Sequence, residues 1–562
     1  MRIQRDHLAV YFNKMDAHFH EITRGSDSIR MKDWKNAFQA EIDGVVDSGS
    51  LSVPMKLPAG KKAIKSRVVG KEKDDGRLKW RLVPKGYMQK PGVDFDEGSI
   101  DAPVVDTTVV RTLIAIGNAC GARMRVCDVF MAFLNAQLTE EVYMYAPPGV
   151  DIGVDDEGNP NVFRLLRAVY GLKQSPSCWN DLIDKWLKTE APGNLTQNPY
   201  DRCFFHAWRG DDFFLLGFHV DDFLIVTTDE AWETEFMTAI SNRFEVKDMG
   251  ALGEPIKDKP GEKLGLLGMQ VDRDLKEGTI KLYLKKYLKG ALDLYDMADV
   301  SPSTTPASEP KSEDMVPGKD EYDARGWNPS RVVGKFLWAA TKVRPDLSVI
   351  TSVLGSERHD PSVAGVKNTI RMMSYVAGTL DMGLTYRSKV TNTADRRTIK
   401  LTEYCDSDWV GDIKLALDPT CRSRGAFLIF AYDGDLVHHR TGLRPSVDTS
   451  STTAELGTLS DGQRRLTWLK RLLVEAGFKV PTIDVYEDNK AAIILAESHG
   501  ITERMRHMHA RDRYVREFAC GGTKEIKLHY IESAKNLADF LTKILSPSMF
   551  RKFRDRIMRI VD

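Results

Sequence analysis

FFLLGFHVDDFLIV, residues 213–226, contains two apolar runs that flank the adjacent carboxylates Asp221 and Asp222. Short runs rich in aromatic and branched residues are typical of strands in the core of a sheet. Neighbouring carboxylates repel each other and are costly to keep ionised away from water unless a cation lies between them. The pattern therefore predicts a Mg²⁺ site for phosphoryl transfer where two strands meet. An exposed hairpin turn is the alternative, since Asp is also common in turns.

The composition places limits on the class of protein. A chain of 562 residues is too long to fold around one hydrophobic core, so its length predicts about three to five domains. The formal net charge is zero, so any binding of nucleic acid would depend on local basic patches. Seven scattered cysteines without a C-x-x-C pair predict a reducing compartment and no structural zinc. The sequence has no apolar run long enough for a membrane span and no signal-peptide core, so we expect an intracellular soluble protein.

A third carboxylate lies in another predicted strand. Residues 106–119 have the spacing of a helix, and residues 123–130 then alternate as a strand. Asp128 falls on the side of this strand that carries Met124 and Val126. A carboxylate in an apolar row needs a partner, so Asp128 is a candidate ligand beside the aspartate pair. An ion pair with an Arg or Lys elsewhere in the chain is the alternative.

The N-terminal part combines a polar segment, a helix and a basic hairpin. Residues 1–30 are polar and predict a linker, whereas residues 31–46 have the apolar spacing of an amphipathic helix. The basic stretch 61–90 contains a D-D-G turn signal between strands that carry Lys and Arg. We interpret it as a flap that contacts phosphates; a solvated edge hairpin is the alternative.

One stretch resembles a particular protein family, and it is LLRAVYGLKQSPSCW (165–179). Together with DVFMAFLN (128–135) and FHVDD (218–222), it resembles the reverse transcriptases of copia-type long-terminal-repeat retrotransposons. The other family blocks follow in order: RLVPKGYMQKPGVDFD (81–96), APVVD (102–106), VYMYAPPG (142–149), FEVKDMG (244–250), LGMQV (267–271) and RPD (344–346). The resemblance covers almost the whole chain.

The C-terminal part carries four carboxylates at the ends of predicted elements. Predicted strands 401–405 and 483–486 lead to Asp406 and Asp488, and predicted helices 452–477 and from 536 onward carry Glu455 and Asp539. Helix capping is the alternative role for Glu455 and Asp488. In this order the four resemble ribonuclease H, within the stretches CDSDWVGD (405–412), SSTTAEL (450–456), YEDNKAAI (486–493) and NLADFLTK (536–543). Asp408 is the alternative to Asp406 as the first of these four carboxylates, and the resemblance favours Asp406.

The resemblance implies an α+β and α/β multidomain fold. A right-hand polymerase of fingers, palm and thumb would precede a connection region and a ribonuclease H-like mixed α/β domain. The expected parts are an N-terminal linker 1–30, fingers and palm 31–229, a helical thumb 230–300, a Pro/Ser-rich linker 301–330, a connection region 331–399 with helices at 332–353 and 362–378, and the ribonuclease H-like domain 400–562 with a basic helix at 505–518.

The resemblance also implies roles for particular residues. Two Mg²⁺ ions per site, with Mn²⁺ as a substitute, would be held in the polymerase by Asp128 and Asp221 with Asp222 in support, and in the nuclease by Asp406, Glu455, Asp488 and Asp539. The implied nucleotide-binding residues are Arg81 with Lys71 or Lys73 on the triphosphate, Phe133 against a 2′-hydroxyl, and Tyr170 and Gln174 on the template side.

We therefore expect an RNA-directed DNA polymerase with ribonuclease H activity that copies retrotransposon RNA. Its expected partners are an RNA template, a DNA primer, the RNA–DNA hybrid, dNTPs and other Pol or Gag products, with no membrane. The expected location is the cytoplasm, within virus-like particles, or else the nucleus. Two alternatives stay open. A decayed nucleic-acid-binding remnant is favoured by His219, which replaces a family Tyr, and a hybrid nuclease would have an inert polymerase half.

Overall fold

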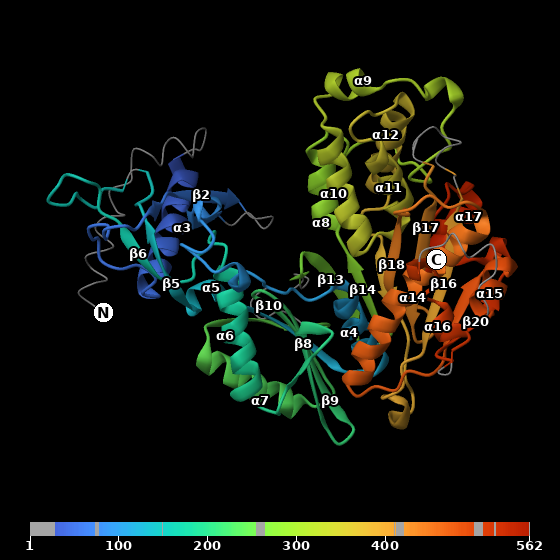
Figure 1. Ribbon diagram of the computed structural model, residues 1–562, viewed down its shortest axis with the longest axis horizontal. Coiled ribbons are helices and arrows are strands. Elements are labelled where there is room, and N and C mark those ends of the chain that lie inside the picture. Colours follow the sequence, from blue (N-terminus) through green and yellow to red (C-terminus); the bar gives the residue numbers. More distant parts are fainter. Residues whose placement is uncertain are drawn as a thin grey trace.

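The computed structural model describes residues 28–72, 78–148, 150–254, 265–409, 411, 421–499, 510–521 and 524–560. Figure 1 shows a small N-terminal lobe, drawn mainly in blue, that is set apart from a larger body. The larger body holds a central sheet, a helical region in yellow-green, and a C-terminal sheet in orange and red. None of the described helices combines the length and the apolar character needed to cross a membrane.

The central sheet has six antiparallel strands in the order β11-β4-β10-β9-β8-β7. They are β4 (Arg123–Val129), β7 (Thr196–Asn198), β8 (Asp201–Arg209), β9 (Asp212–His219), β10 (Asp222–Thr227) and β11 (Val246–Ala251). The two strands predicted around the aspartate pair are confirmed as the hairpin β9–β10. The strand predicted over 123–130 is confirmed as β4, the neighbour of β10.

Helices cover both faces of this sheet, which explains its uninterrupted apolar runs. On one face α4 (Thr107–Ala119), the helix predicted over 106–119, lies so close that a Cβ on Gly117 would be 2.7 Å from Met124 Sδ. On the other face α6 (Ser175–Thr189) and α7 (Glu230–Arg243) pack through aromatic rings, including Trp186 and Phe236 at 5.7 Å. Residues that point to either face of β9 and β10 are therefore buried.

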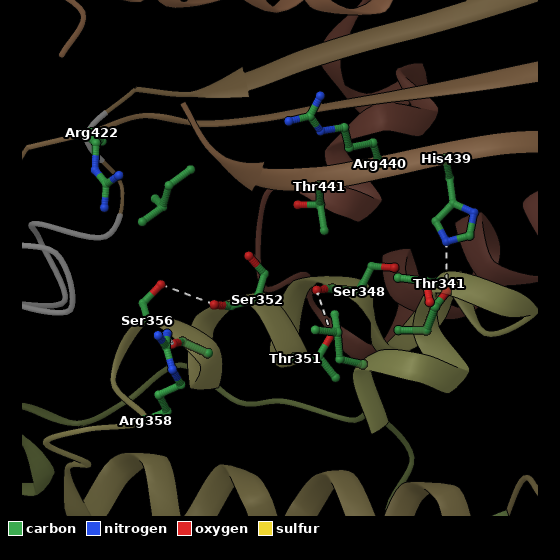
Figure 2. Close-up of a pocket in the computed structure, with 14 residues that line it drawn as sticks. Thr341, Ser348, Thr351, Ser352, Ser356, Arg358, Arg422, His439, Arg440 and Thr441 are labelled. Atoms are coloured by element: carbon green, nitrogen blue, oxygen red, sulfur yellow. Dashed lines mark hydrogen bonds between the residues drawn. The ribbon is translucent and has the colours of Figure 1, made fainter. Parts of the chain in front are cut away.

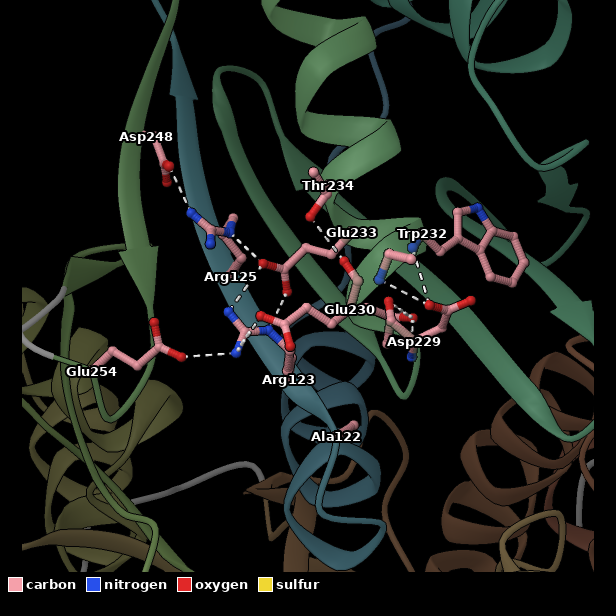
Figure 3. Close-up of polar contacts among 12 residues, drawn as sticks. Ala122, Arg123, Arg125, Asp229, Glu230, Trp232, Glu233, Thr234, Asp248 and Glu254 are labelled. Atoms are coloured by element: carbon pink, nitrogen blue, oxygen red, sulfur yellow. Dashed lines mark hydrogen bonds and ion pairs between the residues drawn. The ribbon is translucent and has the colours of Figure 1, made fainter.

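A buried carboxylate fixes α7 to β4 (Figure 3). Glu233 of α7 is 2% exposed and accepts from Arg125 Nε at 2.6 Å and from Arg123 Nε at 3.2 Å. The two guanidinium groups extend the network to Asp248 at 2.6 Å and to Glu254 at 2.9 Å. Both arginines alternate with Met124 and Val126 along β4, so they lie on the face opposite Asp128.

We expect Glu233→Gln to lower the free energy of unfolding by about 2–3 kcal/mol, because it leaves two partly buried guanidinium groups with one charged partner fewer. Glu235→Gln, on the same helix, is the control, since Glu235 forms an exposed pair with Arg209 that contributes about 0–1 kcal/mol. Urea unfolding monitored by tryptophan fluorescence measures both. Equal effects of the two substitutions would contradict the role assigned to Glu233.

The N-terminal lobe packs one helix on a hairpin. Helix α3 (Ser28–Asp47) confirms the helix predicted over 31–46, and β2 (Ser66–Glu72) with β3 (Leu78–Pro84) confirms the strands of the basic hairpin. Trp80 of β3 lies between Trp34 and Phe38 of α3, with ring centroids at 5.4 and 5.7 Å. Residues 1–27 of the expected linker and the hairpin turn 73–77, with Lys73, lie outside the described residues. The lobe is completed by β1 (Ala63–Ile64), β5 (Gln137–Met144), β6 (Phe163–Arg167) and α5 (Ala132–Asn135).

The helical thumb expected over 230–300 is wrong for most of that segment. After α7 the chain returns to the central sheet as β11 and then builds a separate four-stranded sheet. Glycines with positive φ at Gly250, Gly253, Gly268 and Gly278 interrupt any helix there. In the described part of 230–300, α7 and α8 (Lys285–Asp293) confirm the expected helical character and the other elements are strands. The strands of the separate sheet are β12 (Gly265–Leu266), β13 (Met269–Asp274), β14 (Thr279–Tyr283) and β15 (Gly383–Tyr386).

Residues 301–330 do not form a free linker, which corrects a second expectation. The segment contains α9 (Lys319–Ala324) and packs on α12 (Val363–Ala377), the helix expected over 362–378. The Tyr322 hydroxyl lies 2.6 Å from Thr369 Oγ1, and Asn368 Nδ2 donates to the Ser308 carbonyl at 3.0 Å. Pro- and Ser-rich composition therefore marks an irregular but packed segment here.

The helix expected over 332–353 is two helices. α10 (Pro329–Lys342) and α11 (Ser348–Ser356) are separated at Pro345, which cannot continue a helix. At the break the fully buried Arg344 forms an ion pair with Asp346 at 2.7 Å. The R-P-D block quoted for the family resemblance is thus a buried corner between two helices.

The C-terminal sheet has five strands in the order β18-β17-β16-β19-β20 and mixes parallel and antiparallel pairs. β16 pairs antiparallel with β17 and parallel with β19. The strands are β16 (Leu401–Asp408), β17 (Arg424–Ala431), β18 (Asp435–Leu443), β19 (Ile483–Glu487) and β20 (Ile526–Tyr530). No pattern in the sequence predicted β18, and β16 extends three residues beyond the strand predicted over 401–405.

The helices of this domain agree with the expectation in part. α14 (Ser451–Glu475) confirms the long helix, and α15 (Lys490–Glu497) follows β19. The basic helix expected over 505–518 is wrong in its described part, which has only the 3₁₀ turn η7 (Ala510–Arg513) and the short α16 (Arg516–Ala519). The final helix, expected from 536, is the 3₁₀ segment η9 (Leu537–Leu541) followed by α17 (Pro547–Met558).

Glu403 gives this domain a pH-dependent stability. Its carboxylate is 1% exposed, lies against Gly462 of α14, and burial raises its pKa from 4.5 to about 8. Between those pH values the folded state binds more protons than the unfolded state, so stability falls as the pH rises. We expect Glu403→Gln to match the wild type near pH 4.5 and to melt several degrees higher at pH 8.5. Melting curves across this range test the expectation, and a difference that is independent of pH would contradict it.

Candidate active sites

The central sheet aligns four polar residues in one row. Asp222 of β10 is paired directly with Asp128 of β4 on one side and with His219 of β9 on the other. On the far side of Asp128, Lys247 of β11 is its partner. Directly opposed residues of antiparallel strands lie on the same face with Cβ atoms about 4.5–5.5 Å apart. The row therefore places two carboxylates between an ammonium and an imidazole.

Asp221 occupies the two-residue turn next to this row. The turn is strained, since Val220 is β-branched and has φ of 61°, a left-handed conformation that costs about 1–2 kcal/mol. Two hydrogen bonds hold it, from Trp179 Nε1 to the Val220 carbonyl at 2.7 Å and from the Val129 amide to the Asp221 carbonyl at 2.9 Å. All three aspartates are partly exposed, so the structure brings the predicted residues together at an accessible edge.

Three further predicted residues meet beside the aspartates. Arg81 of β3 lies 4.0 Å from the centroid of the Tyr170 ring, and the Phe133 and Tyr170 rings are 4.8 Å apart. Burial raises the pKa of Tyr170 to about 12, and the nearby charges of Asp221 and Asp128 act in the same direction. Lys71 is exposed on β2 on the same face of the hairpin as Arg81. The arrangement offers cations and a ring surface next to carboxylates.

Gln174 is placed differently from the rest of this group. It is fully buried at the start of α6, where its Oε1 accepts from Gln89 Nε2 at 2.9 Å and its Nε2 donates to the Asp94 carbonyl at 3.1 Å. Both ends of the amide are therefore used inside the lobe. Its geometry supports a role in holding residues 86–95 rather than in direct contact with a template.

The C-terminal sheet gathers a second group of carboxylates from four elements. Asp406 of β16, Asp488 after β19 and Asp539 of η9 offer oxygens that all lie within 4.8 Å of one another; we call them the aspartate triad. Glu455 of α14, Glu487 of β19 and Asp488 form a second such group, the glutamate triad. All four predicted carboxylates thus meet, whereas Asp408 is in neither triad.

Glu487 is the one member of the two triads that was not predicted from the sequence. It is the last residue of β19 and is 0% exposed. The available signal was a second acidic residue directly before Asp488 at the end of an apolar strand, where an ionised side chain is costly without a partner.

Burial and mutual repulsion shift the protonation of both triads. Burial raises the pKa of Asp406 to about 6 and that of Glu455 and Glu487 well above 4.5, with neighbouring carboxylates adding to each shift. Lys543 Nζ lies 2.8 Å from Asp539 Oδ1 and 3.3 Å from Asp406 Oδ2. Such clustered oxygen ligands suit a hard divalent cation.

Two orphaned oxygens test this fit. The Oε2 atoms of Glu455 and Glu487 are buried, and neither accepts a hydrogen bond from any described residue. Buried carboxylate oxygens require a proton, a donor or a cation. The residues of the C-terminal group therefore fit the metal ions that the family resemblance implied.

A cavity of about 550 Å³ lies elsewhere, between α10, α11 and β18 (Figure 2). Several of its hydroxyls donate to nearby carbonyls, as Thr351 does to Leu347 at 2.8 Å, and Arg358 donates to the Gly355 carbonyl. His439 Nε2 donates to the Ala340 carbonyl at 2.8 Å, and its Nδ1 faces Arg111. Burial lowers the pKa of His439 to about 3, so this histidine is neutral. The lining residues that the structure describes include no carboxylate and show no catalytic arrangement.

Comparison with known proteins gives matches along most of the chain. Residues 52–309 match the family model described as reverse transcriptase (RNA-dependent DNA polymerase). The chain is 29% identical over 531 residues to the retrovirus-related Pol polyprotein from transposon TNT 1-94 of Nicotiana tabacum, and 30% identical over 545 residues to that from transposon RE2 of Arabidopsis thaliana. It is 23% identical over 494 residues to the transposon Ty1-NL2 Gag-Pol polyprotein of Saccharomyces cerevisiae.

The three alignments cover 93%, 94% and 87% of this chain, but 37%, 34% and 27% of the relatives. The chain therefore spans about a third of the length of the curated relatives it matches. The family model covers the row Lys247–Asp128–Asp222–His219 and the residues around Tyr170, whereas both carboxylate triads lie beyond its end at residue 309.

Proposed function

We propose that this chain, whose residues 52–309 match the reverse transcriptase family model and which is similar to retrovirus-related Pol polyproteins of transposons, copies RNA into DNA and cleaves the RNA of the resulting hybrid. The observation that carries the polymerase half is the direct pairing of Asp128 with Asp222 beside the Asp221 turn, inside the matched family region. The two carboxylate triads support the nuclease half.

In this proposal the N-terminal lobe is the fingers, the central sheet is the palm, and the C-terminal sheet is the ribonuclease H domain. The thumb begins near residue 265 rather than at 230, because α7 and β11 belong to the central sheet. The proposed partners of the whole protein are an RNA template, a DNA primer, the hybrid, dNTPs and other Pol or Gag products. We propose the cytoplasm as its location, within virus-like particles, with the nucleus as the alternative.

Two Mg²⁺ ions, or Mn²⁺, would be held by Asp128 and Asp221 with Asp222 in support. When bound, they would favour loss of the primer 3′-hydroxyl proton and neutralise the charge of the triphosphate. Arg81, with Lys71 or Lys73, would bind the triphosphate oxygens. Phe133, backed by the Tyr170 ring at 4.8 Å, would exclude a 2′-hydroxyl and so select dNTPs.

His219 supports a second candidate function, a nucleic-acid-binding remnant without turnover. It replaces the Tyr expected from the family resemblance and lies directly opposite Asp222 in the row. An imidazole there changes both the size and the hydrogen bonding of the group next to the aspartates. The residue at position 219 is therefore the one to substitute in order to distinguish an active polymerase from a decayed one.

Extension of a DNA primer on an RNA template, with dNTPs and Mg²⁺, tests the two candidates. We expect extension by the wild type and none by Asp221→Asn, with both proteins binding the hybrid equally. Extension only by His219→Tyr would favour the remnant and identify the residue responsible. Hybrid cleavage without any extension, even by His219→Tyr, would leave only the nuclease function.

A further inference from the structure

We propose that Glu487 is a cation ligand, and that the C-terminal centre has two unequal cation positions. In this inference the glutamate triad binds a divalent cation without competition, whereas the ammonium of Lys543 competes for the aspartate triad. The inference deepens the proposed hybrid cleavage, since it concerns the same site, and rests on it only for the identity of the reaction.

Glu487 is positioned as a ligand rather than as a structural carboxylate. Its Oε1 accepts from the Asn489 amide at 3.0 Å, which aims the side chain at the end of β19, whereas its Oε2 accepts no hydrogen bond from a described residue. Glu455 Oε2 is also buried and accepts no hydrogen bond from a described residue, and both carboxylates offer an oxygen to the glutamate triad. Two buried carboxylates that face each other in this way need a shared cation or a shared proton.

Lys543 makes the two triads electrostatically different. Its ammonium contacts Asp539 and Asp406, the two members that only the aspartate triad contains. Among the described residues, no Lys or Arg forms an ion pair with Glu455 or Glu487. The aspartate triad thus has an ammonium in direct contact with two of its members, whereas the charge of Lys543 acts on Glu455 and Asp488 of the glutamate triad only without such contact.

This difference predicts an order of binding. A cation that enters the aspartate triad must displace an ammonium held by two carboxylates, and this displacement reduces the free energy gained when the cation binds. The Lys543 side chain is 36% exposed on a flexible stem, so it can leave without rearrangement of the core. A cation at the glutamate triad displaces no charged group. Asp488 belongs to both triads, so the two positions share one ligand.

The test measures Ca²⁺ binding to the full chain by calorimetry and by melting temperature. Asp221→Asn serves as the background, so that the central site contributes little. We expect Glu487→Gln to weaken the tighter Ca²⁺ position at least tenfold and to raise the melting temperature without Ca²⁺, because it removes a repelling buried carboxylate. We expect Lys543→Gln to keep the tighter position, strengthen the weaker one several-fold, and lower the melting temperature without Ca²⁺.

Matched controls lie on the surface of the same domain. Glu497→Gln removes an exposed carboxylate near the end of α15, and Lys535→Gln removes an exposed pair with Glu532. Both should bind Ca²⁺ as the background does. If Glu487→Gln does not fold, Glu487→Asp keeps the charge but shortens the reach, and it should also weaken the tighter position.

Unchanged Ca²⁺ affinity in Glu487→Gln or Glu487→Asp would overturn the inference and indicate a shared proton instead. Unchanged binding at the weaker position in Lys543→Gln would overturn the role of Lys543. Cleavage of an RNA–DNA hybrid, measured in parallel with Mg²⁺, separates this inference from the proposed function. Loss of Ca²⁺ binding in Glu487→Gln with no cleavage by the wild type would sink the nuclease proposal and leave the cation site standing.

Discussion

Asp128→Asn should reduce RNA-templated primer extension by about 10³-fold or more. Asp128 lies on β4 between Asp222 and Lys247, so its carboxylate is the central negative group of the row. The amide keeps the shape of the side chain but removes a charged ligand from the proposed metal site, and a metal clamp of this kind contributes several kcal/mol to a phosphoryl transfer. Each 1.36 kcal/mol of lost transition-state stabilisation corresponds to tenfold in rate.

The matched control is Asp248→Asn. Asp248 lies on β11, one residue from Lys247, and pairs with Arg125 on the opposite face of the sheet. It should lose some stability and keep extension within about threefold, since an exposed ion pair contributes little. Single-turnover extension at saturating dNTP measures the rate for both variants. A similar loss of rate in the two variants would mean that general destabilisation, and not a ligand at Asp128, explains the effect.

Much of the central sheet could be predicted, because its signals are local. The apolar runs around Asp221 and Asp222 are strands covered on both faces, and such strands leave an uninterrupted pattern in the sequence. The position of Asp128 followed from its alternation with Met124 and Val126. That Asp128 is opposed to Asp222, and Asp222 to His219, depends on strand register, which no local pattern fixes.

The errors arose where tertiary contacts override local composition. Residues 301–330 have the composition of a linker, yet Tyr322 is buried against α12. The segment after α7 contains apolar residues that fit a helix or a strand, and positive-φ glycines decide for strands. Glu487 was missed because its neighbour Asp488 already fitted the expected pattern. Its position beside Glu455 depends on the packing of α14 against the C-terminal sheet, which is a tertiary contact.

Asp488→Asn is expected to abolish cleavage of an RNA–DNA hybrid, with a loss of at least about 10³-fold, and to leave primer extension unchanged. Asp488 is the one residue shared by the aspartate and glutamate triads, so the substitution is expected to weaken both proposed cation positions at once. Asp539→Asn should be less severe, because Asp539 belongs to one triad. Cleavage of a labelled hybrid under single-turnover conditions ranks the two variants.

Asp484→Asn provides the control on the same strand. Asp484 lies on β19, four residues before Asp488, and its carboxylate contacts His529 at 2.7 Å, outside both triads. Its loss should change stability slightly and cleavage by less than about threefold. If Asp539→Asn proves as inactive as Asp488→Asn while Glu455→Gln and Glu487→Gln stay active, one cation at the aspartate triad suffices for cleavage. The shared position of Asp488 would then carry no special role, and the glutamate triad would have to act only in holding the domain together.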